Sequence, residues 1–168
     1  RALHEVPWLW RLHAVHHMPD RLYWLNAQRS HPLDTLLSSL GPLLVLVLVG
    51  APSSVVAYYG AIAGASAMVQ HSNVEVGPSW LDNFFSTPHL HRLHHSILRS
   101  QADGNYGGVL IIVDQLMGTW VRARTPERLG VETPHLPGTF WALVKSPLNR
   151  ALWGAAAPQP PGDITSSR

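Results

Sequence analysis

The chain opens with the stretch Arg1-Ala-Leu-His-Glu-Val-Pro-Trp-Leu-Trp-Arg-Leu-His-Ala-Val-His-His17, which holds four histidines. Pro7 is well placed as the first residue of a helix, so His4 is expected on a separate, preceding helix. The other three histidines have helical spacing, which puts their imidazoles on one face: His13, His16 and His17. A second cluster repeats this spacing: His91, His94 and His95. Two such clusters in one short chain predict a metal site.

The composition bounds the class of protein. A length of 168 residues fits one domain, and the absence of cysteine excludes disulfides, thiolate-ligated haem and cysteine-held iron–sulfur clusters. The formal net charge is only +2 and is scattered, so we expect no nucleic-acid partner. With 46% hydrophobic and 13% charged residues, the chain is poorly equipped to cover a soluble surface.

An uncharged apolar segment follows the first histidine cluster. Residues 35–74 contain no Asp, Glu, Lys or Arg, and Gly50-Ala-Pro-Ser-Ser54 divides them into two halves. Each half has roughly 16–18 residues, which is short for a full membrane crossing. A membrane hairpin at about 35–70 is therefore expected, either as two tilted transmembrane helices or as a re-entrant hairpin. A buried hairpin in a soluble core is disfavoured because neither half has a polar face.

Charge predicts the side on which the histidines lie. Arginines flank both ends of the hairpin and none lies at its tip. By the positive-inside rule, both histidine clusters are then expected on the cytoplasmic side of an integral membrane protein.

The rest of the chain shows fewer signals. Ser86-Thr-Pro88 is a plausible helix start before the second cluster. Residues 109–117 form a short apolar segment that cannot span and is expected to lie against the membrane or the core. One domain is expected, the metal-binding part at 1–125, followed by a Pro-rich C-terminal extension at 126–168. Within the extension, residues 140–153 are expected to form a peripheral helix and 158–168 a disordered tail.

The eleven histidines fall into candidate ligands and structural residues. His71 ends the second apolar half. The presence of the two histidine clusters in the same chain favours metal coordination by this residue. His89 points away from the shared helical face, while His31 and His135 lie outside the clusters, so these three are interpreted as structural. Eight candidates suit two metals: His4, His13, His16, His17, His71, His91, His94 and His95. Imidazoles alone do not choose among iron, zinc and copper, and neither histidine cluster contains the Glu-x-x-His pair typical of carboxylate di-iron proteins.

Taken in order, these motifs resemble the fatty acid hydroxylase / sterol desaturase superfamily of membrane di-iron oxygenases. The elements that carry the resemblance are Arg1-Ala-Leu-His4, His13-Ala-Val-His-His17, His71-Ser-Asn73, His91-Arg-Leu-His-His95 and Asn105-Tyr-Gly107. Arg29-Ser-His-Pro-Leu33 and Asp114-Gln-Leu-Met-Gly-Thr-Trp120 resemble its bacterial branch, and the similarity covers roughly residues 1–120. In the family a histidine precedes the first arginine. The chain is therefore expected to be N-terminally truncated, without that ligand and the preceding membrane helices.

The resemblance implies a fold, a cofactor and a reaction. The expected fold is an all-α integral membrane helical bundle with a cytoplasmic, histidine-rich di-metal helical cap. Two iron ions, held by the eight histidines, would use O₂ to hydroxylate or desaturate a C–H bond of a fatty acyl chain or sterol. Zinc is an expected substitute in recombinant material, and electrons would come from a separate donor protein. Residues expected to orient the ligands are Asn73, Asn105, Tyr106 and Asp114.

Two other classes of function compete with this interpretation. A histidine-rich membrane metal-binding or transport protein would normally place polar ligands along its spanning helices, and the apolar halves carry none. A zinc-dependent hydrolase would need a general base beside its metal, and no H-E-x-x-H motif is present.

Overall fold

The computed structural model of the protein describes residues 1–74, 76–131 and 135–153. These residues form helices joined by loops and, apart from two isolated bridges, contain no β-structure, which confirms the expected all-helical fold. The α-helices are α1 (Ala2–Glu5), α2 (Pro7–His17), α3 (Pro32–Leu48), α4 (Ser53–Gln70), α5 (Pro88–His94), α6 (Arg99–Ala102), α7 (Ile112–Met117), α8 (Phe140–Lys145) and α9 (Arg150–Trp153). The short 3-10 helices are η1 (Trp24–Gln28), η2 (Trp80–Asn83) and η3 (Ser146–Leu148).

The first two helices divide where the sequence predicts. Val6 is extended, with φ −89° and ψ 116°, and Pro7 begins α2. Proline suits this position because the first N–H of a helix has no intrahelical partner. His4 therefore approaches the centre from α1, at an angle to the three histidines of α2.

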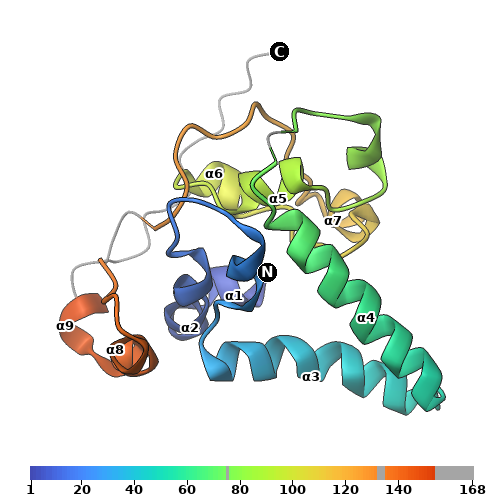
Figure 1. Ribbon diagram of the computed structural model, residues 1–168, viewed down its shortest axis with the longest axis horizontal. Helices are drawn as coiled ribbons and strands as arrows, with labels where there is room; N and C mark the ends of the chain where they lie inside the picture. The colour runs from blue at the N-terminus through green and yellow to red at the C-terminus, as the bar shows by residue number, and fades with distance from the viewer. Residues whose placement is uncertain (75, 132–134, 154–168) are drawn as a thin grey trace.

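Helices α3 and α4 form the predicted hairpin, and the chain turns between them at Gly50, whose φ of 68° favours glycine. The two helices diverge from this turn as a V (Figure 1). The N-terminus of α3 is capped by His31, whose Nδ1 accepts the Leu33 N–H at 3.1 Å. No helix in the described part of the chain combines the length and the apolarity that a bilayer crossing needs.

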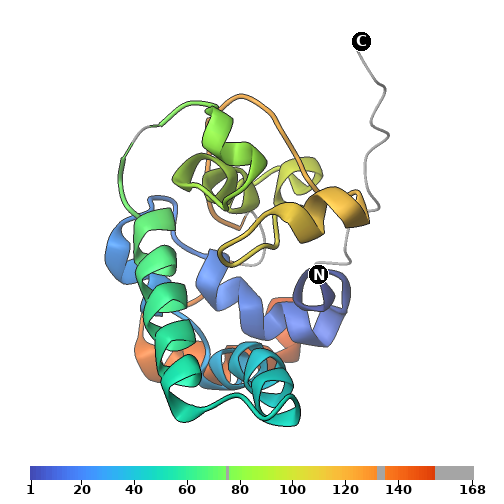
Figure 2. The ribbon, with the colours of Figure 1, turned by 90° about the vertical axis from the view of Figure 1, so that its right-hand side faces the viewer.

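The remaining helices lie in layers. In both ribbon views, α5, α6 and α7 form one layer, α1 and α2 lie in the middle, and α3 lies on the opposite side (Figures 1 and 2). Thr87 starts α5 by accepting the Leu90 N–H, and Pro88 occupies its first turn, which confirms the predicted helix start.

The interior is unusually polar. In the described residues, 18 buried side chains are polar and 10 are hydrophobic. The largest apolar cluster contains only three buried residues, Leu90, Leu93 and Ile111, beside α5. Because buried polar groups need partners, the contacts of the imidazoles decide how the middle of this molecule is held together.

The expected single helix over residues 140–153 is wrong. The chain forms α8, η3 and α9 instead, since Pro147 lacks an N–H and clashes with the carbonyl four residues earlier. The segment packs back onto the hairpin base, where the His31 Nε2–H donates to the Val144 carbonyl at 3.1 Å. The expected tail at 158–168 lies outside the described residues.

Candidate metal centre

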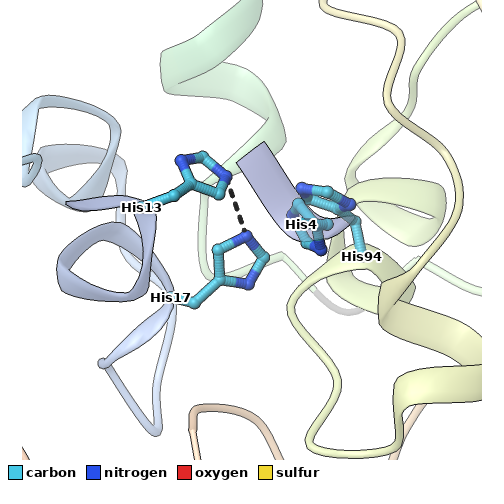
Figure 3. A group of neighbouring side chains, drawn as sticks. All are labelled: His4, His13, His17 and His94. Atoms are coloured by element: carbon cyan, nitrogen blue, oxygen red, sulfur yellow. Dashed lines mark hydrogen bonds between the residues drawn. The ribbon is translucent and has the colours of Figure 1, made fainter. Parts of the chain in front are cut away.

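Eight histidines meet between α1, α2, the end of α4 and α5, in two groups. Within each group, one ligand atom from every residue lies within 4.8 Å of the others. The first group comprises His4, His13, His17 and His94, whose rings point toward one another from α1, α2 and α5 (Figure 3). The second group comprises His16, His71, His91 and His95. These are the eight residues that the sequence selects.

Neighbours in the sequence belong to different groups. His16 and His17 separate, and so do His94 and His95. Each H-x-x-H-H motif therefore gives two ligands to one group and a single ligand to the other. The rings of His17 and His95 stack with their centroids 4.3 Å apart, and so join the two groups.

Five of the imidazoles use Nδ1 to contact an oxygen of the protein. His13 and His4 contact carboxylates, and three others contact backbone carbonyls: His16 (Arg29 O, 3.1 Å), His71 (Ala67 O, 2.8 Å) and His94 (Gly104 O, 2.8 Å). Carbonyl and carboxylate oxygens only accept hydrogen bonds, so Nδ1 must carry the proton. In each neutral ring, Nε2 is then left with a free lone pair.

Within the centre, Nε2 atoms of these rings and of the remaining histidines face one another. The separations are 3.2 Å for His13–His17 and for His16–His71, and 3.1 Å for His71–His91 and for His91–His95. His16 and His71 both carry the proton on Nδ1, so their facing Nε2 lone pairs repel at 3.2 Å unless a cation lies between them. At metal–nitrogen distances of about 2.0–2.1 Å, neighbouring ligand nitrogens lie ~2.9–3.4 Å apart in octahedral or tetrahedral geometry. The donor set thus fits a metal ion in each group.

Burial keeps the imidazoles neutral and ready for metal. Desolvation, reinforced by neighbouring imidazoles, lowers the pKa well below the ordinary value of 6.5 for six of them: His4, His16, His17, His91, His94 and His95. Desolvation also lowers the pKa of His71. A ligand must be unprotonated to bind metal, so this environment favours coordination near neutral pH.

Two carboxylates that the sequence interpretation missed support the first group. Asp34 Oδ2 accepts from His13 Nδ1 at 2.9 Å, and Asp103 Oδ1 contacts His4 Nδ1 at 3.3 Å. Asp34 lies in the first turn of α3 and Asp103 directly follows α6. A signal for Asp34 was present, because an acid at the start of a long uncharged segment needs a reason to be there. Asp103 resembled an ordinary Asp-Gly turn.

The loop after α6 holds the first group from the side. The half-buried ring of Tyr106 lies 5.3 Å from His4 and 5.7 Å from His94, measured between centroids. Asp114 accepts the Tyr106 N–H and the Gly107 N–H, both at 2.8 Å. Asn105 bonds to backbone groups of Leu90 and Val121, which ties the loop to α5. Tyr106 packs against the imidazoles, while Asn105 and Asp114 hold the backbone of the loop; in the described residues none of the three has a hydrogen bond to a ligand nitrogen.

The structure does not bring Asn73 to the centre. The chain turns away after His71, and Asn73 is exposed with no hydrogen bond to an imidazole in the described residues. His31, His89 and His135 belong to neither group, in line with their interpretation as structural residues.

A large cavity adjoins the centre. It measures about 1130 Å³ and reaches from the small and apolar side chains of α3 and α4 to the loop before α7. The histidines that line it are His13 from the first group and three from the second group: His16, His71 and His91. A smaller pocket of about 210 Å³, which His4 and His94 help to line, lies beside Tyr106. The larger cavity can therefore admit a long apolar molecule to the second group.

Comparisons with known proteins identify the family of this chain and several relatives. The model of the fatty acid hydroxylase family matches residues 1–119. The ornithine lipid hydroxylase OlsE of Rhizobium tropici is 38% identical over 151 residues, which cover 89% of this chain and 46% of that protein. Human alkylglycerol monooxygenase is 33% identical over 124 residues, or 71% of this chain and 26% of that protein. The chain thus spans less than half the length of either relative, and no solved structure matches it.

Proposed function

The chain belongs to the fatty acid hydroxylase family, and on this basis we propose that it forms the metal-bearing part of an enzyme that oxidises a membrane lipid with O₂. The reaction is hydroxylation of a C–H bond, with desaturation as the variant that the same centre would support. The relatives are named as hydroxylases or monooxygenases of lipids, which supports this class of substrate. The fatty acyl chain and the sterol are the substrate types that we consider.

The proposed cofactor is a pair of iron ions, one in each histidine group. When bound and reduced by a separate electron-donor protein, the pair would supply the power to activate O₂ and abstract hydrogen from an unactivated carbon. The contribution of this chain is to hold eight imidazoles together, five of them through Nδ1 contacts with protein oxygens. Zinc also suits imidazole ligands, so its presence in a recombinant sample would not contradict the proposal.

The cavity is the proposed lipid site. Gly60, Ala63 and Ala67 of α4 line one wall and leave room because their side chains are small. At the inner end, the buried Gln70 amide donates to the Gly108 carbonyl at 2.7 Å and fixes the wall next to His71. These residues would exclude water from an apolar chain and direct it toward the second group.

We also propose that the hairpin lies in the membrane, with both histidine groups on the cytoplasmic side. Apolar side chains at its tip are open to the surroundings, and Leu48 is 75% exposed. Exposed apolar surface of this extent is typical of a membrane or protein contact. Arginines at the base of the hairpin and none at the tip give the sidedness.

The observation that carries the proposal is the convergence of two four-histidine groups beside a cavity of lipid size. The test uses the whole protein that contains this chain, expressed in bacterial membranes. We expect mass spectrometry to find a lipid that has gained one oxygen atom or lost two hydrogens. Formation of either product should depend on O₂ and on iron in the protein.

The variants His94→Ala and His135→Ala make a matched pair. We expect His94→Ala to lose product and bound metal, because His94 is a buried member of the first group, and His135→Ala to keep both. Full product formation by His94→Ala would contradict the ligand assignment. Metal binding without any O₂ consumption or lipid product would favour a metal-binding or transport protein instead.

A further inference from the structure

The two histidine groups differ in the charge of the atoms that support them. In the first group, Asp34 holds His13 and Asp103 holds His4. In the second group, the Nδ1 atoms of His16 and His71 contact neutral oxygens, which are the Arg29 carbonyl and Ser30 hydroxyl for His16 and the Ala67 carbonyl for His71. No carboxylate contacts an imidazole of the second group in the described residues. Two formally negative groups therefore support one metal site, and none is found to support the other.

The groups also differ in what they face. Three members of the second group line the large cavity, against His13 alone from the first group. On the other side of the first group, the partly exposed Trp10 packs with its ring centroid 5.2 Å from His4 and 5.4 Å from His17. The second group thus presents more imidazoles to the large cavity, whereas the first group borders it only through His13 and otherwise lines the smaller pocket beside Tyr106.

A carboxylate on the far nitrogen of an imidazole strengthens metal binding. The hydrogen bond fixes the tautomer and ring orientation, and the negative charge makes Nε2 a better donor. Removal of such a partner typically weakens metal affinity by about 10- to 100-fold. A backbone carbonyl fixes the ring in the same way but carries no net charge.

We propose that the two metal sites have different roles: the first group is a tight anchoring site, and the second group is a weaker site that meets the substrate. Asp34 and Asp103 are positioning residues that act through His13 and His4. The inference rests on the proposed function in one respect, since it requires two metal ions in this chain.

The two carboxylates are not equivalent. The Asp34 side chain is 3% exposed, and its contact with His13 is the shorter of the two. The Asp103 side chain is 30% exposed and forms an ion pair with Arg99, whose Nε–H donates to Asp103 Oδ2 at 2.9 Å. Solvent and the guanidinium both screen Asp103. Asp34 should therefore matter more.

The test is a metal titration of the whole, metal-free protein that contains this chain. Co²⁺ added without O₂ reports uptake by its visible absorption, and the ratio of metal to protein is measured in parallel. We expect two ions per chain in the wild-type protein, with affinities at least about 10-fold apart. Asp34→Asn keeps an oxygen acceptor for His13 and removes only the charge. It should weaken the tight class by about 10- to 100-fold and leave the weak class unchanged.

Further variants make the result decisive. Asp103→Asn should weaken the same class by a smaller factor, and it replaces Asp34→Asn in the test if that variant does not fold. Asp82→Asn is the matched control, because Asp82 is fully buried and contacts Ser79 and Thr87 but no imidazole. Its titration should equal that of the wild-type protein.

The outcomes separate this inference from the proposed function. Uptake of fewer than two ions by the wild-type protein would count against the two-metal function itself. Two ions of equal affinity, or an Asp34→Asn variant that weakens both classes alike, would overturn the division of roles and leave the two-metal function standing.

Discussion

At the scale of single residues, each imidazole with an Nδ1 contact has one nitrogen bound to the protein and leaves the other available to a metal ion. His71 illustrates this arrangement: Nδ1 contacts the Ala67 carbonyl within its own helix turn, and Nε2 faces His16 and His91. The ring therefore needs no further partner to be held in place. Replacement of His71 by glutamine would lose this arrangement. Glutamine has neither the rigid ring nor a second nitrogen at the opposite edge that could bind a metal ion.

The eight histidines could be chosen from the sequence, but their division into groups could not. Helical spacing puts His13, His16 and His17 broadly on one face. Adjacent residues nevertheless differ by about 100° around the axis. That angle is enough to send His16 and His17 to opposite sides of the centre. Asp34 and Asp103 were missed for a related reason, since their contacts join residues 21 and 99 positions apart and depend on how the helices pack.

Asn105 gives a prediction for stability. Its φ of 55° lies in the left-handed region, and its side chain bonds to Leu90 O, Val121 O and Val121 N. Asn105→Ala should lower the free energy of unfolding by about 2–4 kcal/mol, because it loses these bonds and adds backbone strain. Asn105→Gly should cost roughly 1 kcal/mol less, since glycine adopts this φ freely. Urea unfolding measures both, and equal losses would argue against strain at this position.

At the scale of elements, the local signals were reliable wherever a proline or a cap was present. Pro7 and the Thr87-Pro88 pair gave helix starts, and Gly50 gave the turn of the hairpin. Pro147 is equally visible in the sequence, so the break between α8 and α9 was also predictable. What the sequence did not contain is the arrangement of these helices around the centre, which depends on contacts between distant segments.

Helix α4 gives a prediction for substrate access. Ala63 lines the large cavity, and Ala65, two residues further along, is exposed and does not line it. Ala63→Phe should reduce turnover of long-chain lipids by at least about 10-fold, because the larger ring fills part of the space. Its metal content should remain that of the wild-type protein, since no ligand is touched.

Ala65→Phe is the control for the added ring, and it should keep both turnover and metal. Product formation and metal content are measured on the same samples, with a short-chain lipid as a second substrate. Equal turnover by the two variants would show that the lipid does not enter along α4.

At the scale of the whole molecule, the described interior is a cluster of imidazoles with little apolar packing around it. The all-helical fold class was expected from the family resemblance, and the helix starts at Pro7 and at Thr87-Pro88 agree with it. The histidine count implied a polar interior. It did not imply how much stability is lost when neutral imidazoles are buried beside one another. Without metal, neutral imidazoles are buried beside one another, and that arrangement becomes less stable as protons become available.

The metal-free protein should therefore be sensitive to acid. Burial lowers the folded-state pKa of these imidazoles below the unfolded value near 6.5, so below that pH the unfolded chain binds more protons. Stability is full above about pH 7.5 and falls as the pH drops through 6.5, by up to ~1.4 kcal/mol per pH unit for each imidazole. Thermal unfolding between about pH 8 and pH 5 measures this loss. A Tm that stayed constant across the range would contradict the burial of neutral imidazoles.

Metal should oppose this loss, because an ion that binds only the folded state adds stability in proportion to its affinity and concentration. The same melts with Co²⁺ present should show a higher Tm at neutral pH. The gain should shrink under acid, as protons compete for Nε2.

The adjacent histidines of each H-x-x-H-H motif belong to different groups. This arrangement determines when each group is completed during protein synthesis. His4 and His16 leave the ribosome early, but the first group is incomplete until His94 is made and the second until His95 is made. These two residues are neighbours, so both sites are completed within one step of translation. The newborn chain thus has no stage at which one finished site can load while the other waits. Loading of either proposed metal site must follow synthesis of the hairpin and of α5, and a chain released before His94 would carry neither site.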